Sequence, residues 1–130
     1  FEPAALATGE STDILLYLMS LPNPSPAVQS AIGSGVAYLK SVAIYGFVYS
    51  GGRGPPGGRM LKPDAGAGPI WSRYMSLTTD KPVFGDRDKT IHDSVNDLSL
   101  ERRNGYAWYG SGPQKAIDAF AAWSKTHPQP

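Results

Sequence analysis

Apolar residues recur at helical spacing in two neighbouring segments near the start of the chain. In the first, leucine and isoleucine return every three or four positions, which is typical of an α-helix. We expect Thr8 to cap this helix and Pro24 to end it, because the residue before a proline avoids helical geometry. Ser25 and Pro26 then predict the start of a second helix, since proline at the first helical position loses no hydrogen bond. Together the two segments predict an antiparallel helical hairpin over residues 1–43.

Both predicted helices are apolar around most of their circumference. Helices of this kind are buried, so each needs neighbours that cover its outer faces. Gly33 and Gly35 lower the helix propensity of the second segment by roughly 1 kcal/mol each relative to alanine, and we expect them to allow the close approach of another helix. The chain supplies only part of the covering surface, which indicates a piece of a larger helical domain.

The rest of the chain has no clean hydrophobic period except near its end. Glycine and proline occupy eleven of the nineteen positions between Gly51 and Pro69, which predicts a long loop. A β-branched and aromatic run before this loop predicts a short extended segment. Gly112 and Pro113 open a final helical pattern. The chain therefore divides into a helical hairpin (1–43), a Gly/Pro-rich loop (44–70), aromatic and charged loops (71–110) and a C-terminal helix (111–130).

Composition excludes several classes of function. The 130 residues contain no cysteine, which excludes disulfide scaffolds, thiolate zinc sites and cysteine nucleophiles. The formal net charge is +1, so no overall field attracts a polyanion and any anion must be bound locally. No apolar run approaches the roughly 20 residues that a membrane helix needs. We therefore expect neither a nucleic acid nor a membrane as a partner.

Two further motifs carry little weight. Residues 52–57 match the glycine spacing of dinucleotide-binding loops, but two prolines remove amide donors and no amphipathic helix follows. Arg53 and Arg59 lie in the same tract, yet two arginines neutralise too few phosphates for strong RNA binding. His92 and His127 have no second histidine or cysteine at metal-ligand spacing, and we interpret both as surface or hydrogen-bonded residues.

Two arginines lie in settings that suit a ligand carboxylate. Arg87 lies between Asp86 and Asp88. This pattern is typical of an exposed ion pair of little energetic value, or of carboxylates that hold a guanidinium toward an anion, which its planar donors bind with two parallel hydrogen bonds. Arg73 is a second candidate, framed by aromatic residues that include Tyr74. From these residues alone, both the structural and the functional interpretation stay open.

The aromatic residues from Tyr106 to Tyr109 also have two interpretations. Such side chains stack on sugars, and they also bury large surfaces in a core while one polar end stays free. A mixed arrangement, with Trp108 inward and a tyrosine outward, satisfies both interpretations.

Several longer motifs follow one another along the chain. They are Asn23–Pro26, Trp71–Tyr74, Pro82–Asp88, Thr90–His92 and Glu101–Tyr109. In composition and order this series resembles the pectate lyases of polysaccharide lyase family 10, specifically the C-terminal part of their catalytic module. The resemblance covers nearly the whole chain, so we expect residues 1–130 to be the C-terminal portion of such a domain, with 71–110 as its substrate-binding loops.

The resemblance implies a mainly α fold, part of an (α/α) toroid or barrel with long irregular loops and few short strands. It also implies a secreted enzyme that cleaves polygalacturonate, the backbone of pectin, by calcium-dependent β-elimination. Removal of the C5 proton of a galacturonate moves negative charge onto its carboxylate, and calcium and arginine side chains stabilise that charge. Calcium takes oxygen ligands and can bridge the substrate to protein carboxylates.

The resemblance further implies roles for individual residues. Arg73 and Arg87 match arginines that bind substrate carboxylates, and we expect Asp86 and Asp88 to orient Arg87. The supporting residues are Asp86, Asp88, Tyr74, Tyr106 and Tyr109. We expect the catalytic base, an arginine in this family, to lie upstream of Phe1, and the calcium-binding acids to lie mainly outside the chain as well. The partners we expect are pectin oligosaccharides and the remainder of the catalytic module or a companion chain, without which the segment would be inactive.

The sequence departs from the family pattern beside the predicted site. Lys89 stands where family members usually carry glycine, and Asp93 and Ser94 stand where they usually carry tyrosine and aspartate. These departures bear on substrate preference and leave Arg73 and Arg87 in place. Two other functions are kept as alternatives. One is a non-catalytic module that binds acidic polysaccharide, and the other is a structural helical fragment with no ligand.

Overall fold

The computed structural model describes residues 4–50 and 58–128, and the glycine-spaced motif of residues 52–57 with Arg53 lies outside this description. The described elements follow in the order β1 (Ala5–Ala7), α1 (Thr8–Ser20), α2 (Pro26–Ser41), β2 (Phe47–Ser50), β3 (Met60–Pro63), β4 (Trp71–Ser72), β5 (Tyr74–Ser76), β6 (Phe84–Gly85), β7 (Ile91–His92), the 3-10 helix η1 (Val95–Asp97), α3 (Leu100–Gly105), β8 (Tyr109–Gly110) and α4 (Gln114–Thr126). None of the described helices is long and apolar enough to cross a membrane.

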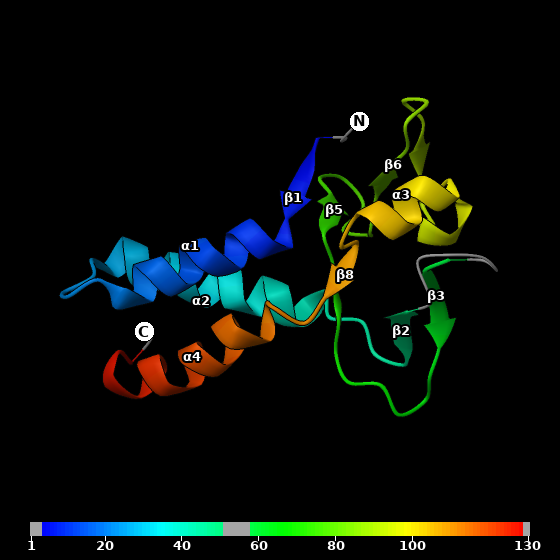
Figure 1. The fold of residues 1–130 in the computed structure, drawn as a ribbon. Helices are drawn as coiled ribbons and strands as arrows, with labels where there is room; N and C mark the ends of the chain where they lie inside the picture. Colours follow the sequence, from blue (N-terminus) through cyan, green and yellow to red (C-terminus); the bar gives the residue numbers. More distant parts are fainter. Residues whose placement is uncertain (1–3, 51–57, 129–130) are drawn as a thin grey trace.

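The three long helices α1, α2 and α4 pack against one another at one end of the molecule, and the short strands and α3 occupy the other end (Figure 1). The start of α2 is as expected, because the Ser25 side chain accepts a hydrogen bond from the Val28 N–H at 3.2 Å and Pro26 is the first helical residue. The expected cap of α1 is wrong by one residue. Ala7 is the N-cap, and the Thr8 hydroxyl instead donates to the Ser72 carbonyl oxygen at 2.6 Å.

The close approach expected at the glycines of α2 occurs at Gly35. A Cβ atom placed there would lie 2.7 Å from Cδ2 of Leu15 on α1, closer than real Cβ contacts allow. Leu15 belongs to a buried core formed between the three long helices and β4, with Val36, Leu39, Trp71 and Ala116. The indole N–H of Trp71 donates to the Leu39 carbonyl oxygen at 2.7 Å, so this side chain ties α2 to the strand end of the molecule.

The strands within the described residues form four antiparallel pairs: β1 with β5, β2 with β3, β4 with β8, and β6 with β7. The expectation of a mainly α fold that is part of an (α/α) toroid is therefore wrong, because the described residues combine one layer of three long helices with small antiparallel sheets and form no ring of helix pairs. The physical reason is the composition of residues 44–110. Aromatic and β-branched residues there alternate with turn residues over stretches too short for helices, and they pair as two- to four-residue strands.

A second core of aromatic residues supports the strand end. Phe84, Val95, Leu98 and Trp108 are buried in it, and the ring of Trp108 packs edge-on against that of Phe84, with the centroids 5.6 Å apart. Trp108 is 1% exposed and its indole N–H donates to the Arg102 carbonyl oxygen at 2.8 Å. Of the two interpretations of the aromatic stretch, core packing is confirmed for Trp108. Tyr106 and Tyr109 are half-buried around it.

Candidate substrate-binding site

Arg73 connects β4 and β5, and its backbone is fixed on both sides. Its N–H donates to the Trp108 carbonyl oxygen at 2.7 Å, and its carbonyl oxygen accepts the N–H of Thr8, the first residue of α1, at 3.0 Å. Its guanidinium carbon lies 5.2 Å from the ring centre of Tyr74 and 5.8 Å from that of Tyr106, within the range of cation–π attraction. The two tyrosines therefore restrict where this half-buried side chain can point.

A cavity of about 160 Å³ lies beside Arg73. Its walls include Trp71, Tyr109 and the first two residues of α1, Thr8 and Gly9. The positive end of the α1 dipole and the guanidinium both favour a negative charge there. The described carboxylates form no ion pair with Arg73. The cavity can therefore receive an anionic group without first breaking an ion pair in this part of the chain.

Arg87 lies in the turn that joins β6 to β7, and its side chain is exposed. Its Nε donates to Oε1 of Glu101, the second residue of α3, at 2.5 Å. Among the described residues, the carboxylate that pairs with the Arg87 guanidinium is that of Glu101, so Asp86 and Asp88 do not hold this guanidinium directly. Glu101 was not among the residues predicted for the site. Only its place in the motif Glu101–Tyr109 pointed to it.

Asp86 holds the backbone of the Arg87 turn instead. Its Oδ1 accepts the Arg87 N–H at 2.7 Å and the Ser99 hydroxyl at 2.8 Å, and its Oδ2 accepts the Ser99 N–H at 2.7 Å. Burial raises the pKa of Asp86, but the hydrogen bonds from Ser99 and Arg87 outweigh burial and leave the pKa below its usual value. Asp86 therefore stays ionised and ties the turn to Ser99, the N-cap of α3.

Asp88 closes the same turn from its other side. It accepts hydrogen bonds from the hydroxyl and, at 3.0 Å, from the N–H of Thr90, and these bonds lower the pKa of its carboxyl. The Thr90 hydroxyl oxygen is also 2.7 Å from Nε2 of His92, so His92 is hydrogen-bonded as expected. Lys89 has φ of 67°, a left-handed conformation that glycine adopts at no steric cost. This conformation explains why glycine suits the position.

Arg102, on α3, is 1% exposed. Its Nε donates to the carbonyl oxygen of Gly85, next but one to Arg87, at 3.2 Å. Its guanidinium carbon also lies 4.0 Å from the ring centre of Tyr106, the ring that faces Arg73. Arg102 thus joins the backbone of one candidate arginine to the aromatic support of the other. Sequence reasoning missed it, because an arginine in a charged helical turn gives no sign of burial.

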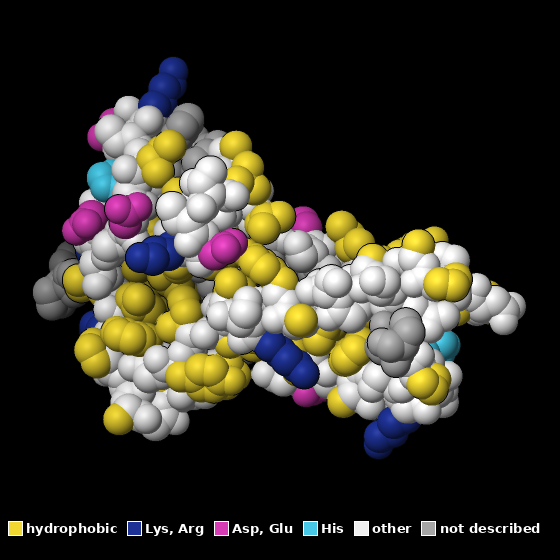
Figure 2. Space-filling model, turned by 180° about the vertical axis from the view of Figure 1, so that it is seen from behind, with side chains coloured by type: hydrophobic (Ala, Val, Ile, Leu, Met, Phe, Trp, Pro, Cys, Tyr) yellow, Lys and Arg dark blue, Asp and Glu magenta, His cyan; other side chains and the backbone are white. Residues whose placement is uncertain are grey.

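The segments that carry Arg73 and Arg87 lie at the same end of the molecule, next to β5 and β6 (Figure 1). The backbones also connect, because the Val83 N–H donates to the Tyr74 carbonyl oxygen at 3.2 Å. On the face shown in Figure 2, acidic, basic and histidine side chains gather over this strand end, whereas the helical end shows few charges. On that face most charged side chains therefore lie at the strand end, next to a patch of hydrophobic side chains.

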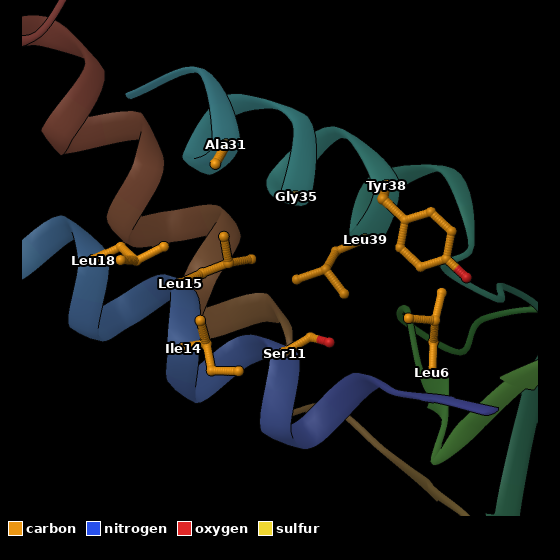
Figure 3. A pocket seen from close by; sticks show the side chains of 9 residues that line it. All are labelled: Leu6, Ser11, Ile14, Leu15, Leu18, Ala31, Gly35, Tyr38 and Leu39. Carbon is orange, nitrogen blue, oxygen red and sulfur yellow. The ribbon is translucent and has the colours of Figure 1, made fainter. Parts of the chain in front are cut away.

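Another concavity, at the helical end, has a different character. A groove of about 350 Å³ runs between α1 and α2, and Figure 3 shows its lining of Leu6, Ile14, Leu15, Leu18 and Leu39 with few polar groups. Ile14, on its rim, is 58% exposed. The polar side chains of this lining are Ser11 and Tyr38, and none of its residues is charged, so the groove suits a uronate carboxylate less well than the strand end does.

The model of the family described as pectic acid lyase matches residues 1–117. The chain belongs to this pectic acid lyase family. A search among curated proteins found no match.

Two solved structures of a family 10 polysaccharide lyase from Cellvibrio cellulosa are similar to this pectic acid lyase chain. One is an aspartate-to-alanine mutant in complex with trigalacturonic acid, with a TM-score of 0.79, 29% sequence identity and 91% of this chain covered. The other is described as the lyase alone, with a TM-score of 0.80, 29% identity and 92% of this chain covered. Each match covers 36% of the Cellvibrio chain, so the chain spans about a third of the length of that lyase.

The described residues of this chain do not fit a calcium ion. No three acidic or histidine side chains among residues 4–50 and 58–128 lie close enough together to hold a metal. Calcium needs six to eight oxygen ligands. The oxygens of Asp86 are occupied by Ser99 and Arg87, and Asp88 is bonded to Thr90. These two carboxylates therefore serve the turn, and no step of the chemistry is assigned to calcium at this site.

Proposed function

We propose that this chain is part of a pectate lyase that cleaves polygalacturonate by β-elimination, and that it supplies Arg73 and Arg87 to bind galacturonate carboxylates. The observation that carries this proposal is the setting of Arg73. Its guanidinium is held by two tyrosine rings at the edge of a cavity that also faces the start of α1. Membership of the pectic acid lyase family supports the reaction, and the trigalacturonic acid complex of the similar Cellvibrio lyase supports the class of ligand.

The chemistry explains why arginines suit this task. The C5 proton of galacturonate is weakly acidic, and its removal places negative charge on the neighbouring carboxylate. A guanidinium already aimed at that carboxylate stabilises the charge as it develops, without reorganisation during the reaction. Arg73 is held by Tyr74 and Tyr106, and Arg87 by Glu101 and by the turn that Asp86 anchors. Both arginines are therefore preorganised.

In this proposal the remaining parts of the reaction come from other polypeptide. The base that removes the C5 proton and the ligands of a calcium ion lie outside the described residues, in the remainder of a catalytic module or in a companion chain. Calcium, when bound there, would supply a second positive charge on the substrate carboxylate. Tyr109, which lines the cavity beside Arg73, would contact the sugar. Because pectin is an extracellular plant polymer, the proposed function implies secretion.

The proposal is tested by incubating the complete protein with polygalacturonate and calcium and following the ultraviolet absorbance of the unsaturated product. We expect product to form, and Arg73→Ala to lower turnover about 100- to 1000-fold, as expected when one charge-stabilising donor is lost. Lys125→Ala, which removes an exposed positive charge from α4, is the matched control and should leave turnover unchanged. Binding of trigalacturonic acid without product would instead indicate a non-catalytic module, and neither binding nor product would indicate a structural one.

A further inference from the structure

The contact between Arg87 and Glu101 uses one specific edge of the guanidinium. Arginine has five N–H donors, one on Nε and four on the two terminal nitrogens. Glu101 accepts the Nε donor at 2.5 Å. The pair of terminal nitrogens is then left to form the end-on fork that binds a carboxylate through two parallel hydrogen bonds. Glu101 can therefore fix the direction of the fork while the fork itself binds an anion.

The backbone that carries Arg87 is fastened to the segment that carries Glu101 at three successive positions. Gly85 accepts a hydrogen bond from Nε of Arg102, Asp86 accepts two from Ser99, and Arg87 donates to Glu101. The donors and acceptors on the other side all lie in residues 99–102, at the start of α3. This arrangement fixes the separation of the two backbones, so the position of Glu101 determines where the Arg87 side chain points.

The energetics of the pair point to orientation rather than to stability. The side chains of Arg87 and Glu101 are 60% and 66% exposed, and exposed ion pairs contribute little to folding. A carboxylate beside a site for a polyanion also repels the ligand. A carboxylate there is consistent with substrate binding only if the gain in binding from orienting Arg87 is larger than the cost of this repulsion.

We propose that Glu101 is a positioning residue for Arg87: its carboxylate holds the Nε edge and directs the terminal nitrogens toward a galacturonate carboxylate. The inference rests on the proposed function and adds a residue to it. It distinguishes the hydrogen bond that Glu101 accepts from the charge that Glu101 carries. Glutamine keeps an acceptor oxygen at the same reach without the charge, whereas alanine removes both.

The test is calorimetric titration of trigalacturonic acid into the complete protein and its variants. We expect Glu101→Ala to weaken binding about tenfold, which corresponds to ~1.4 kcal/mol. Glu101→Gln should bind within about twofold of the wild type, because its amide oxygen replaces the acceptor. In an Arg87→Ala background, Glu101→Ala should have no further effect, since the residue acts only through Arg87. Asp13→Ala, which removes an exposed carboxylate from α1, is the matched control for net charge and should leave binding unchanged.

Three results would overturn the inference. The first is that Glu101→Ala binds trigalacturonic acid as tightly as the wild type or more tightly. The second is that Glu101→Gln weakens binding as much as Glu101→Ala does. The third is that Glu101→Ala weakens binding by the same factor in the Arg87→Ala background as in the wild type. Melting temperatures of all variants identify any loss of folding. The Arg87→Ala variant separates the two proposals: if it binds as well as the wild type, the proposed role of Arg87 fails, whereas if it binds weakly and Glu101→Ala binds normally, only the role of Glu101 fails.

Discussion

Asp86→Asn perturbs the anchor of the Arg87 turn with almost no change in shape. Oδ2 of Asp86 accepts the Ser99 N–H at 2.7 Å, while Oδ1 accepts the Arg87 N–H at 2.7 Å and the Ser99 hydroxyl at 2.8 Å. The substitution replaces one of these oxygens with an NH2 group. In either orientation of the amide, that group faces a backbone N–H. At least one hydrogen bond to an ionised acceptor is therefore lost, at a side chain that is 6% exposed.

The expected cost follows from these contacts. A hydrogen bond to a charged group contributes about 1.5–3 kcal/mol, and a buried donor without a partner costs about 1–3 kcal/mol. We expect the turn to lose about 2 kcal/mol of local stability, which corresponds to roughly 30-fold faster hydrogen exchange of the Ser99 amide. Trigalacturonic acid should bind more weakly as well, because the turn carries Arg87.

Hydrogen exchange of the complete protein, followed by mass spectrometry of the peptides that contain Ser99 and Arg87, measures this loss. Asp88→Asn is the matched control. It makes the same chemical change two residues away, where the carboxylate accepts hydrogen bonds from Thr90 of the same turn. The control should leave the Ser99 amide protected. Equal protection in wild type and Asp86→Asn, or equal loss in both variants, would refute the assignment of Asp86 as the anchor.

The remaining predictions concern pH, packing, backbone conformation and charge. The pKa of Asp86 in the folded protein lies below the ordinary 3.8, so its ionised carboxylate stabilises the fold above about pH 5, and this stabilisation is lost as the pH falls through the folded pKa. In an acid titration, the stability of the wild type should therefore approach that of Asp86→Asn below pH 3.8. Trp71→Phe should lower the free energy of unfolding by about 1–3 kcal/mol in chemical denaturation, because the Leu39 carbonyl loses a buried donor. Lys89→Gly should raise it by roughly 0.5–1 kcal/mol, since glycine relieves a left-handed conformation but loses more backbone entropy. Arg73→Lys should bind trigalacturonic acid more weakly than the wild type by calorimetry, because an ammonium group cannot form the two-point contact.

The helices could be predicted from the sequence because their signals are local. Ser25 and Pro26 define the start of α2 through chemistry within one turn, and the apolar spacing of α1 and α2 directly reports their buried faces. The strand pairs could not be predicted in the same way. A two-residue strand such as β4 has no periodicity. In its pairing with β8, Trp71 lies opposite Gly110 and Ser72 opposite Tyr109, so the partners are 39 and 37 positions apart and only tertiary packing selects them.

The residues of the candidate site also differ in whether local sequence or tertiary packing reveals them. Arg73 and Arg87 were found through motifs, which record residue types and order. The roles of Glu101 and Arg102 depend on where α3 packs: one side chain reaches Arg87 across fourteen positions, and the other is buried beneath Tyr106. Neither contact can be recognised from the local sequence, because a Glu-Arg-Arg run is also typical of a solvent-exposed helical turn.

A crystal structure of the complete protein with trigalacturonic acid would show whether Arg73 and Arg87 bind uronate carboxylates. We expect one uronate carboxylate within hydrogen-bond distance, about 2.7–3.2 Å, of the Arg73 guanidinium in the cavity at the start of α1, and a second on the terminal nitrogens of Arg87. An oligosaccharide bound on another surface, with Arg73 and Arg87 turned toward different sides of the molecule, would contradict it.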